Sequence, residues 1–205
     1  MNALEASGLT KRFGSRKVFS DISFRLETGS SLAVTGRNGS GKSTLLMLLL
    51  GLHHPNKGEF SFQKDGTSLD EAAIRTATSL VSPYLNLYDQ LTGEENLSFL
   101  AALSGVNMTG KEYSALLTRV GLEGRGDDLV SGYSSGMKQR LKYAAALVKD
   151  PVYLFLDEPT ANLDTEGKGF VHDLIEERRG RSIIVLATNE QEEYSLADDT
   201  LRLDQ

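Results

Sequence analysis

Gly36-Arg37-Asn38-Gly39-Ser40-Gly41-Lys42-Ser43-Thr44 is the stretch that decides the fold, because it fits the phosphate-loop pattern G-x-x-x-x-G-K-[ST]. The run Ser31-Leu32-Ala33-Val34-Thr35 before it predicts a buried strand, and the run from Leu45 to Leu50 after it predicts a buried helix. That strand–loop–helix order is the setting the pattern requires. Its glycines let the backbone wrap closely around an anion while several N–H groups point inward.

Two side chains of this loop suit a nucleoside triphosphate that carries a metal ion. Lys42 brings a positive charge for the β- and γ-phosphates, and Ser43 offers a hydroxyl to Mg²⁺, an ion that keeps several waters and few protein ligands. A chance glycine-rich turn is the alternative, which the flanking strand and helix disfavour. The predicted fold class is α/β, with a P-loop core around a mainly parallel sheet.

The bulk properties of the chain allow an ordinary globular ATPase. Its 205 residues suffice for one domain, or for one core with a smaller subdomain, and its net charge of −6 disfavours a nucleic-acid partner. There is no cysteine, so no disulfide framework is expected. Met1 to Ser20 lacks the apolar core of a signal peptide, and the run from Leu45 to Leu50 is far short of the ~18 residues that span a bilayer. We therefore expect a soluble chain without a pore of its own.

Hydrophobic periodicity divides the chain into three parts. The first third predicts strands at Leu4–Leu9, Val18–Leu26 and Glu59–Gln63. Residues from about Gly93 to Leu147 have helical spacing, and the last third predicts strands at 152–156 and 183–187 with a helix at 170–178 between them. Three buried strands then end at Gly36, Asp157 and Thr188-Asn189. Ligands of open α/β sheets bind beyond the carboxyl ends of strands, so these candidates are expected on one edge.

Asp157-Glu158-Pro159-Thr160 follows one of these buried strands. Asp157 is suited to hold Mg²⁺, and Glu158 could orient or deprotonate an attacking water. The alternative is a strand-end turn with solvated acids, which the nearby phosphate loop disfavours.

Tyr133 to Arg140 opens a helix that is predicted to run to about Val148. Ser134 and Ser135 are favourable caps, and a serine-glycine helix start can present hydroxyl and N–H donors to phosphate. A plain N-cap is the alternative for this motif when it is taken alone.

The ordered set of motifs resembles an ATP-binding cassette (ABC) ATPase, the nucleotide-binding subunit of ABC transporters. The resemblance covers about Leu4 to Leu203 and separates the chain from small P-loop kinases and switch GTPases, which lack the Ser-Ser-Gly helix. It implies that residues 36–44 are the Walker A motif and that Leu154-Phe155-Leu156-Asp157 is the Walker B motif, with Glu158 as its catalytic glutamate. It also implies that residues 133–137 are the signature motif and that Asn162-Leu163-Asp164 is the D-loop. Phe13 would stack on adenine, unless it is merely a core residue.

Two positions depart from the family pattern. Ser82-Pro83 stands where the Q-loop glutamine is expected, and Gln90 comes too late to replace it. Asn189 stands in place of the switch histidine, and an amide can donate a hydrogen bond but cannot take a proton. His53, His54 and His172 do not fill this gap and are interpreted as surface or loop residues. The departures bring the rate of hydrolysis into question.

The resemblance implies a complete set of sites. The catalytic residues would be Glu158, Lys42 and Asn189, and the metal ligands Ser43 and Asp157. ATP would be bound by Phe13, Gly36, Arg37, Asn38, Gly39, Ser40, Gly41, Lys42, Ser43, Thr44, Ser134, Gly136 and Asp164.

The resemblance also implies an assembly. The chain would be a single ABC ATPase domain, with the α/β core and an N-terminal antiparallel β subdomain at about 1–92 and 148–205, and a helical subdomain at about 93–147. It would close on ATP and Mg²⁺ as a head-to-tail dimer with a second copy or a homologous ABC subunit. It would drive an integral membrane permease of export type through the loop from Ser82 to Asp89, on the cytoplasmic face of the membrane. The alternatives are an ABC protein acting on ribosomes or DNA, which the lack of a second cassette or a coiled-coil insertion disfavours, and a nucleotide-binding regulator with weak hydrolysis.

Overall fold

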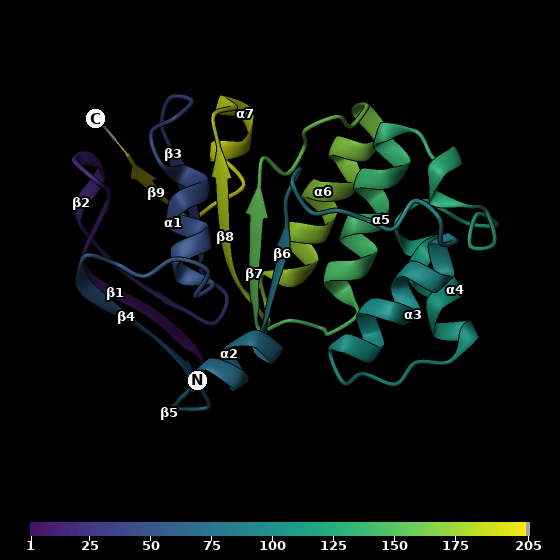
Figure 1. Ribbon diagram of the computed structural model, residues 1–205, viewed down its shortest axis with the longest axis horizontal. Coiled ribbons are helices and arrows are strands. Elements are labelled where there is room, and N and C mark those ends of the chain that lie inside the picture. The colour runs from purple at the N-terminus through teal and green to yellow at the C-terminus, as the bar shows by residue number, and fades with distance from the viewer. Residues whose placement is uncertain (204–205) are drawn as a thin grey trace.

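The central sheet is built from the apolar runs of the sequence, because a strand that is covered on both faces needs apolar residues at successive positions. The computed structural model describes residues 1–203, and in it this sheet has the order β6-β7-β8-β3-β9 with neighbouring strands parallel. Its strands are β3 (Ser31–Thr35), β6 (Thr78–Val81), β7 (Tyr153–Asp157), β8 (Ile183–Thr188) and β9 (Asp199–Arg202). It lies in the middle of the molecule (Figure 1).

A second, antiparallel sheet covers one side of the first, at the left of Figure 1. It has the order β2-β1-β4-β5. Its strands are β1 (Ala3–Phe13), β2 (Arg16–Glu27), β4 (Lys57–Lys64) and β5 (Thr67–Ser68), so the three strands predicted in the first third are confirmed and are longer than predicted. A tight turn at Gly14-Ser15 joins β1 to β2 and pairs Phe13 with Arg16 across the hairpin.

The helices lie between and beside the two sheets. They are α1 (Lys42–Leu49), α2 (Glu71–Ala77), α3 (Gly93–Leu103), α4 (Gly110–Arg119), the 3₁₀ turn η1 (Val130–Gly132), α5 (Ser135–Leu147), α6 (Thr165–Arg178) and α7 (Gln191–Tyr194). Thr92 and Thr109 begin α3 and α4 with complete capping boxes. The helices α3, α4 and α5 gather at the end of the molecule opposite the antiparallel sheet (Figure 1).

Five elements were not predicted from the sequence: α2, β5, β6, α7 and β9. Helix α2 is short, β6 begins with the polar pair Thr78-Ser79, and β9 carries largely exposed residues, so none has a clear periodic signal. Pairing with a neighbouring strand creates both β6 and β9. Their assignment therefore depends on tertiary contacts.

The parallel sheet divides two hydrophobic clusters because alternate side chains of a strand point to opposite faces. On β7, Tyr153 and Phe155 join the cluster that contains α1 and the antiparallel sheet, whereas Leu154 and Leu156 join the cluster that contains α5 and α6. All five residues of β7 are buried. The strand that ends in Asp157 is thus held from both sides.

Tyr153 also joins the two sheets by hydrogen bonding. It is fully buried, its ring contacts Phe62 of β4 with centroids 4.7 Å apart, and its hydroxyl lies 3.0 Å from the Ala3 carbonyl and 2.5 Å from the Gln63 carbonyl. Both carbonyls belong to strands of the antiparallel sheet. This contact orients the sheet that carries Phe13 relative to the strand that carries Asp157.

Removing the hydroxyl in Tyr153→Phe should lower the free energy of unfolding by about 1–2 kcal/mol, because a buried hydrogen bond is lost while the ring packing is kept. Denaturant unfolding measures this change. Tyr113→Phe is the matched control: Tyr113 is also buried, but no hydrogen bond of its hydroxyl occurs within residues 1–203, so a smaller effect is expected. Equal effects of the two substitutions would contradict the role of the Tyr153 hydroxyl.

Candidate nucleotide-binding site

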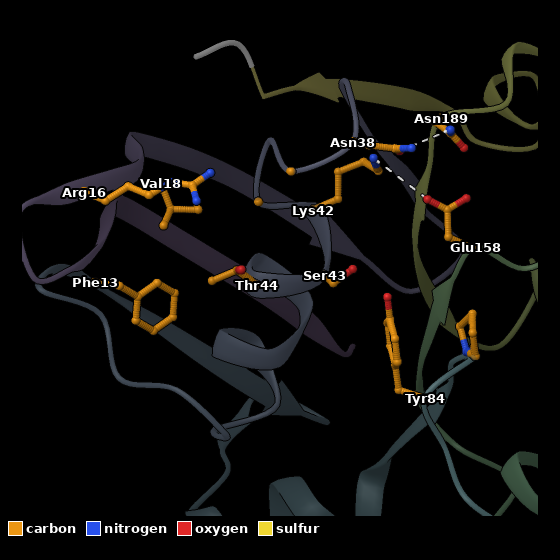
Figure 2. A pocket seen from close by; sticks show the side chains of 13 residues that line it. Phe13, Arg16, Val18, Asn38, Lys42, Ser43, Thr44, Tyr84, Glu158 and Asn189 are labelled. Atoms are coloured by element: carbon orange, nitrogen blue, oxygen red, sulfur yellow. Dashed lines mark hydrogen bonds and ion pairs between the residues drawn. The ribbon is translucent and has the colours of Figure 1, made fainter.

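The three strand ends that the sequence analysis singled out open onto one cleft, as expected. The cleft has a volume of about 770 Å³, and Figure 2 shows the side chains that line it. Its lining residues are Phe13, Arg16, Val18, Asn38, Gly39, Gly41, Lys42, Ser43, Thr44, Pro83, Tyr84, Glu158 and Asn189. Residues that follow β3, β6, β7 and β8 therefore meet at the carboxyl edge of the parallel sheet.

The phosphate loop wraps around the ammonium group of Lys42. Its Nζ donates to the carbonyls of Gly36 at 2.9 Å and Arg37 at 3.5 Å, and the residue is only 6% exposed. Helix α1 begins after Gly41, which has a φ of +105°, and a Cβ built there would come within 2.4 Å of Val18 Cγ1. Glycine is thus required both by the backbone conformation and by the close approach of β2.

Ser43 and Asp157 form the second part of the site. The Ser43 hydroxyl donates to Asp157 Oδ1 at 3.0 Å, and the Ser82 hydroxyl lies 3.4 Å from Asp157 Oδ2. Burial raises the pKa of Asp157, and the hydrogen bonds from Ser43 and Ser82 oppose that shift. The result is a buried carboxylate next to a hydroxyl, a pair of oxygen donors suited to a hard cation.

Glu158 has an unusual backbone conformation. Its φ is +48°, which is uncommon for a residue other than glycine, and its N–H donates to the Ala187 carbonyl at 2.8 Å. The side chain enters the cleft with its carboxylate 3.8 Å from Lys42 Nζ (Figure 2). Burial raises the pKa of Glu158 and the charge of Lys42 lowers it. A carboxylate with a raised pKa facing a cleft is suited to accept a proton.

Asn189 connects the end of β8 to the phosphate loop. Its Nδ2 donates to Asn38 Oδ1 at 3.3 Å, and its carbonyl accepts from the Tyr194 hydroxyl at 3.4 Å. On helix α7, which follows Asn189, the buried carboxylate of Glu193 accepts hydrogen bonds from the backbone N–H and the hydroxyl of Thr160. The segment after Asn189 is thereby attached to the turn that follows Glu158.

An aromatic cluster forms the far end of the cleft. The Phe13 ring is 49% exposed, contacts the His53 ring edge-on at 5.5 Å, and has Lys11 Nζ 4.9 Å from its centroid. The alternative that Phe13 belongs to the core is therefore wrong, because half of its surface is free to stack. His53 and His54 lie in the connection after α1, whereas His172 lies on α6.

Three residues that line the cleft were missed in the sequence analysis: Arg16, Val18 and Tyr84. Pro83 also lines it, and the sequence analysis named it only as a departure from the family pattern. Arg16 could have been found, because the hairpin turn pairs it with Phe13 on the neighbouring strand. Pro83 and Tyr84 follow β6, and without that strand their place at the sheet edge was not visible.

Residues 19–161 match the model of the family described as "ABC transporter". The chain belongs to this family. It is 33% identical over 202 residues to the uncharacterized ABC transporter ATP-binding protein YybJ of Bacillus subtilis, an alignment that covers 98% of the chain and 92% of that relative. It is 32% identical to the Nod factor export ATP-binding protein I of Rhizobium etli over 97% of the chain, but it spans only 64% of that relative.

The fold of this ABC ATPase also matches solved structures. An ATP binding subunit of an ABC transporter superimposes with a TM-score of 0.85 at 27% identity, covering 98% of this chain and 85% of that one. A bacterial Atm1-family ABC exporter with ATP bound has the same TM-score at 22% identity and is covered to 37%, which supports the fold alone. The chain is an ATP-binding ATPase of the P-loop α/β fold, and residues 1–203 contain no helix long and apolar enough to cross a membrane.

Six of the residues predicted to bind ATP are not among those that line the cleft. Three belong to the phosphate loop: Gly36, Arg37 and Ser40; Ser40 is buried, and Arg37 lines a neighbouring cleft. The others are Ser134, Gly136 and Asp164. Ser134 caps α5 by accepting from the Met137 N–H at 3.2 Å, and Asp164 caps α6 by accepting from the Gly167 N–H at 2.8 Å. Nucleotide contacts by these residues stay predictions.

Replacing Asp157 by Asn should stabilise the nucleotide-free ABC ATPase at neutral pH. The pKa of Asp157 is raised in the folded state, so the fold favours the protonated carboxyl over the carboxylate. The stability that the protonated form contributes is lost as the pH rises through the folded-state pKa, and an uncharged Asn avoids that loss. The midpoint of thermal unfolding should rise by about 2–4 °C for each kcal/mol regained, and the gain should shrink as the pH is lowered toward the folded-state pKa of Asp157.

Asp150→Asn is the control with the opposite sign. A hydrogen bond from Arg178 lowers the pKa of Asp150, so its charge stabilises the fold above the unfolded-state pKa. This variant should melt lower than the wild type at neutral pH. Asp157→Asn melting below the wild type at pH 7.5 would contradict the assignment of Asp157 as a destabilising buried charge.

Proposed function

We propose that this ABC ATPase binds Mg²⁺-ATP in the cleft and closes as a head-to-tail dimer. The observation that supports this proposal is that the phosphate loop and the helix start at Ser134 do not share a cleft. Lys42, Ser43 and Glu158 line the cleft, whereas Ser134 begins α5 outside it. Each ATP is then held between the phosphate loop of one copy and the Ser134 helix start of the other, because a helix N-terminus presents N–H donors to an anion.

Binding would use the two ends of the cleft differently. Adenine stacks on the exposed face of Phe13, and the triphosphate enters the loop formed by Gly39, Gly41 and Lys42. The Lys42 ammonium donates to the Gly36 carbonyl and faces the Glu158 carboxylate. The lysine is thus positioned before the nucleotide arrives, so little of its side-chain entropy is lost on binding.

Ser43 and Asp157 are the residues that would hold Mg²⁺. Their oxygens already lie 3.0 Å apart, and residues 1–203 contain no group of three or more His, Cys, Asp or Glu side chains that could hold a metal alone. This donor set fits an ion that takes its other ligands from phosphate and water. When bound, Mg²⁺ neutralises charge on the phosphates.

Glu158 is the residue we assign to the attacking water. Its carboxylate lines the cleft 3.8 Å from Lys42 Nζ, and its raised pKa favours acceptance of a proton. The strained backbone at Glu158 is held by the hydrogen bond of its N–H to Ala187, so the direction of the carboxylate is set by β8.

A membrane permease is the proposed partner, with export as the direction of transport. The exposed rings of Tyr84 and Tyr88 lie on the connection between β6 and α3, and a groove of about 280 Å³ opens beside it. Relatives named for Nod factor export and daunorubicin resistance support the export type. The protein would then be peripheral on the cytoplasmic face of the membrane. A weakly hydrolysing nucleotide-binding regulator is the second candidate, favoured by Asn189 and Pro83 in the cleft.

Glu158→Gln should trap the closed dimer. The substitution keeps the shape of the side chain but removes the proton acceptor, so turnover should fall by roughly 10²–10⁴-fold while ATP still binds. Light scattering with ATP and Mg²⁺ should then register a shift from monomer to dimer. Adding Ser134→Arg is the control, because it should block the shift while the cleft of each monomer still binds ATP. A Glu158→Gln protein that stays monomeric at saturating ATP argues against the sandwich.

Asn189→His should raise kcat with little change in the affinity for ATP. An imidazolium can stabilise charge that develops on the γ-phosphate in the transition state, and one such preorganised contact is worth about a hundredfold in rate. Steady-state ATPase kinetics measure the change. Lys42→Ala is the negative control, because turnover that it abolishes takes place in this cleft. An unchanged or lower kcat in a folded Asn189→His protein would mean that the native asparagine is not what limits hydrolysis.

A further inference from the structure

Tyr84 is an aromatic residue that lines the nucleotide cleft as well as the exposed connection between β6 and α3. It lies on the connection between β6 and α3, and its side chain lines the cleft although the residue is 73% exposed. Figure 2 shows its hydroxyl directed into the cleft, toward the side where Ser43 and Glu158 lie. Within residues 1–203 the hydroxyl has no hydrogen-bond partner. An aromatic ring held at the surface with an unpaired hydroxyl facing a ligand site is a candidate ligand contact.

The backbone that carries Tyr84 is firmly anchored. Ser82 is 2% exposed, and its hydroxyl lies 3.4 Å from Asp157 Oδ2 and accepts from the Tyr84 N–H at 3.3 Å. From the other side, Lys142 of α5 donates to the carbonyls of Ser82 at 3.2 Å and Pro83 at 2.8 Å. The Cα of Tyr84 is therefore fixed relative to Asp157, so its ring is limited to a few rotamers over the cleft.

We propose that the Tyr84 hydroxyl hydrogen-bonds to a water molecule in the coordination shell of the Mg²⁺ that accompanies bound ATP. The inference rests on the proposed function, since it uses Ser43 and Asp157 as the protein side of the metal site. Mg²⁺ retains several waters, and a phenol can donate to or accept from one of them. The hydroxyl enters from the wall of the cleft that faces Ser43 (Figure 2).

This contact would supply a polar side chain on the wall of the cleft that Pro83 and Tyr84 form. Pro83 has no side-chain donor or acceptor, although it lines the cleft next to Tyr84. Ser82 cannot serve in its place, because its hydroxyl is already engaged by Asp157 and by the Tyr84 N–H. Tyr84 is therefore the residue of this connection that can reach the metal-bound water.

The test compares Tyr84→Phe with the wild type in nucleotide binding, with and without the metal. The variant keeps the ring and removes only the hydroxyl, so it should fold normally. The dissociation constant of a fluorescent ATP analogue should rise about 3–10-fold in Mg²⁺, the worth of one net hydrogen bond. With EDTA in place of Mg²⁺ the two proteins should bind equally. The Mg²⁺ concentration that gives half-maximal ATPase activity should rise in parallel.

Tyr88→Phe is the matched control. Tyr88 lies on the same connection and is 51% exposed, but its ring packs against Phe99 at 5.0 Å and does not line the cleft. It should bind as the wild type does under both conditions.

Two results would overturn the proposal: equal binding of Tyr84→Phe and wild type in Mg²⁺, or a loss of affinity that is as large in EDTA. Lys42→Ala separates this failure from failure of the proposed function, because that variant must lose ATP binding if the cleft is the nucleotide site.

Discussion

The buried carboxylate of Asp157 is the constraint on which the site depends. It terminates a strand with both faces covered by apolar side chains, so its charge is desolvated and its pKa is raised. Hydroxyls from two other segments compensate: Ser43 brings the start of α1, and Ser82 brings the connection after β6. One unfavourable charge therefore draws the phosphate loop and the β6–α3 connection together, and leaves an oxygen pair that a cation can use.

The two sheets have different parts in building the cleft. The parallel sheet sets the chemical groups at its carboxyl edge, because β3, β7 and β8 run in the same direction and end at nearly the same level. The antiparallel sheet supplies Phe13 and Arg16 from one hairpin, and the Tyr153 hydroxyl determines where that hairpin stands relative to β7. The hairpin that carries Phe13 and the strand that ends in Asp157 are thus connected through a contact remote from the cleft.

The connections around the site join it to the helical end of the molecule. Lys142 of α5 holds the carbonyls of Ser82 and Pro83, and α5 is the helix that begins at Ser134. Glu193 attaches the segment after Asn189 to Thr160, next to Glu158. Hydrogen bonds of defined geometry therefore connect the segments that line the cleft to α5 and to the turn after Glu158.

The sequence by itself determined the phosphate loop, the three buried strands and the edge at which they meet, because continuous apolar runs and glycine spacing are local signals. It also predicted the Ser134 cap of α5 correctly. Only the tertiary structure decided that Arg16, Pro83 and Tyr84 belong to the cleft. Those residues depend on a hairpin register and on β6, a four-residue strand that pairing with β7 creates. Contacts of this kind are long-range, so no window of sequence contains them.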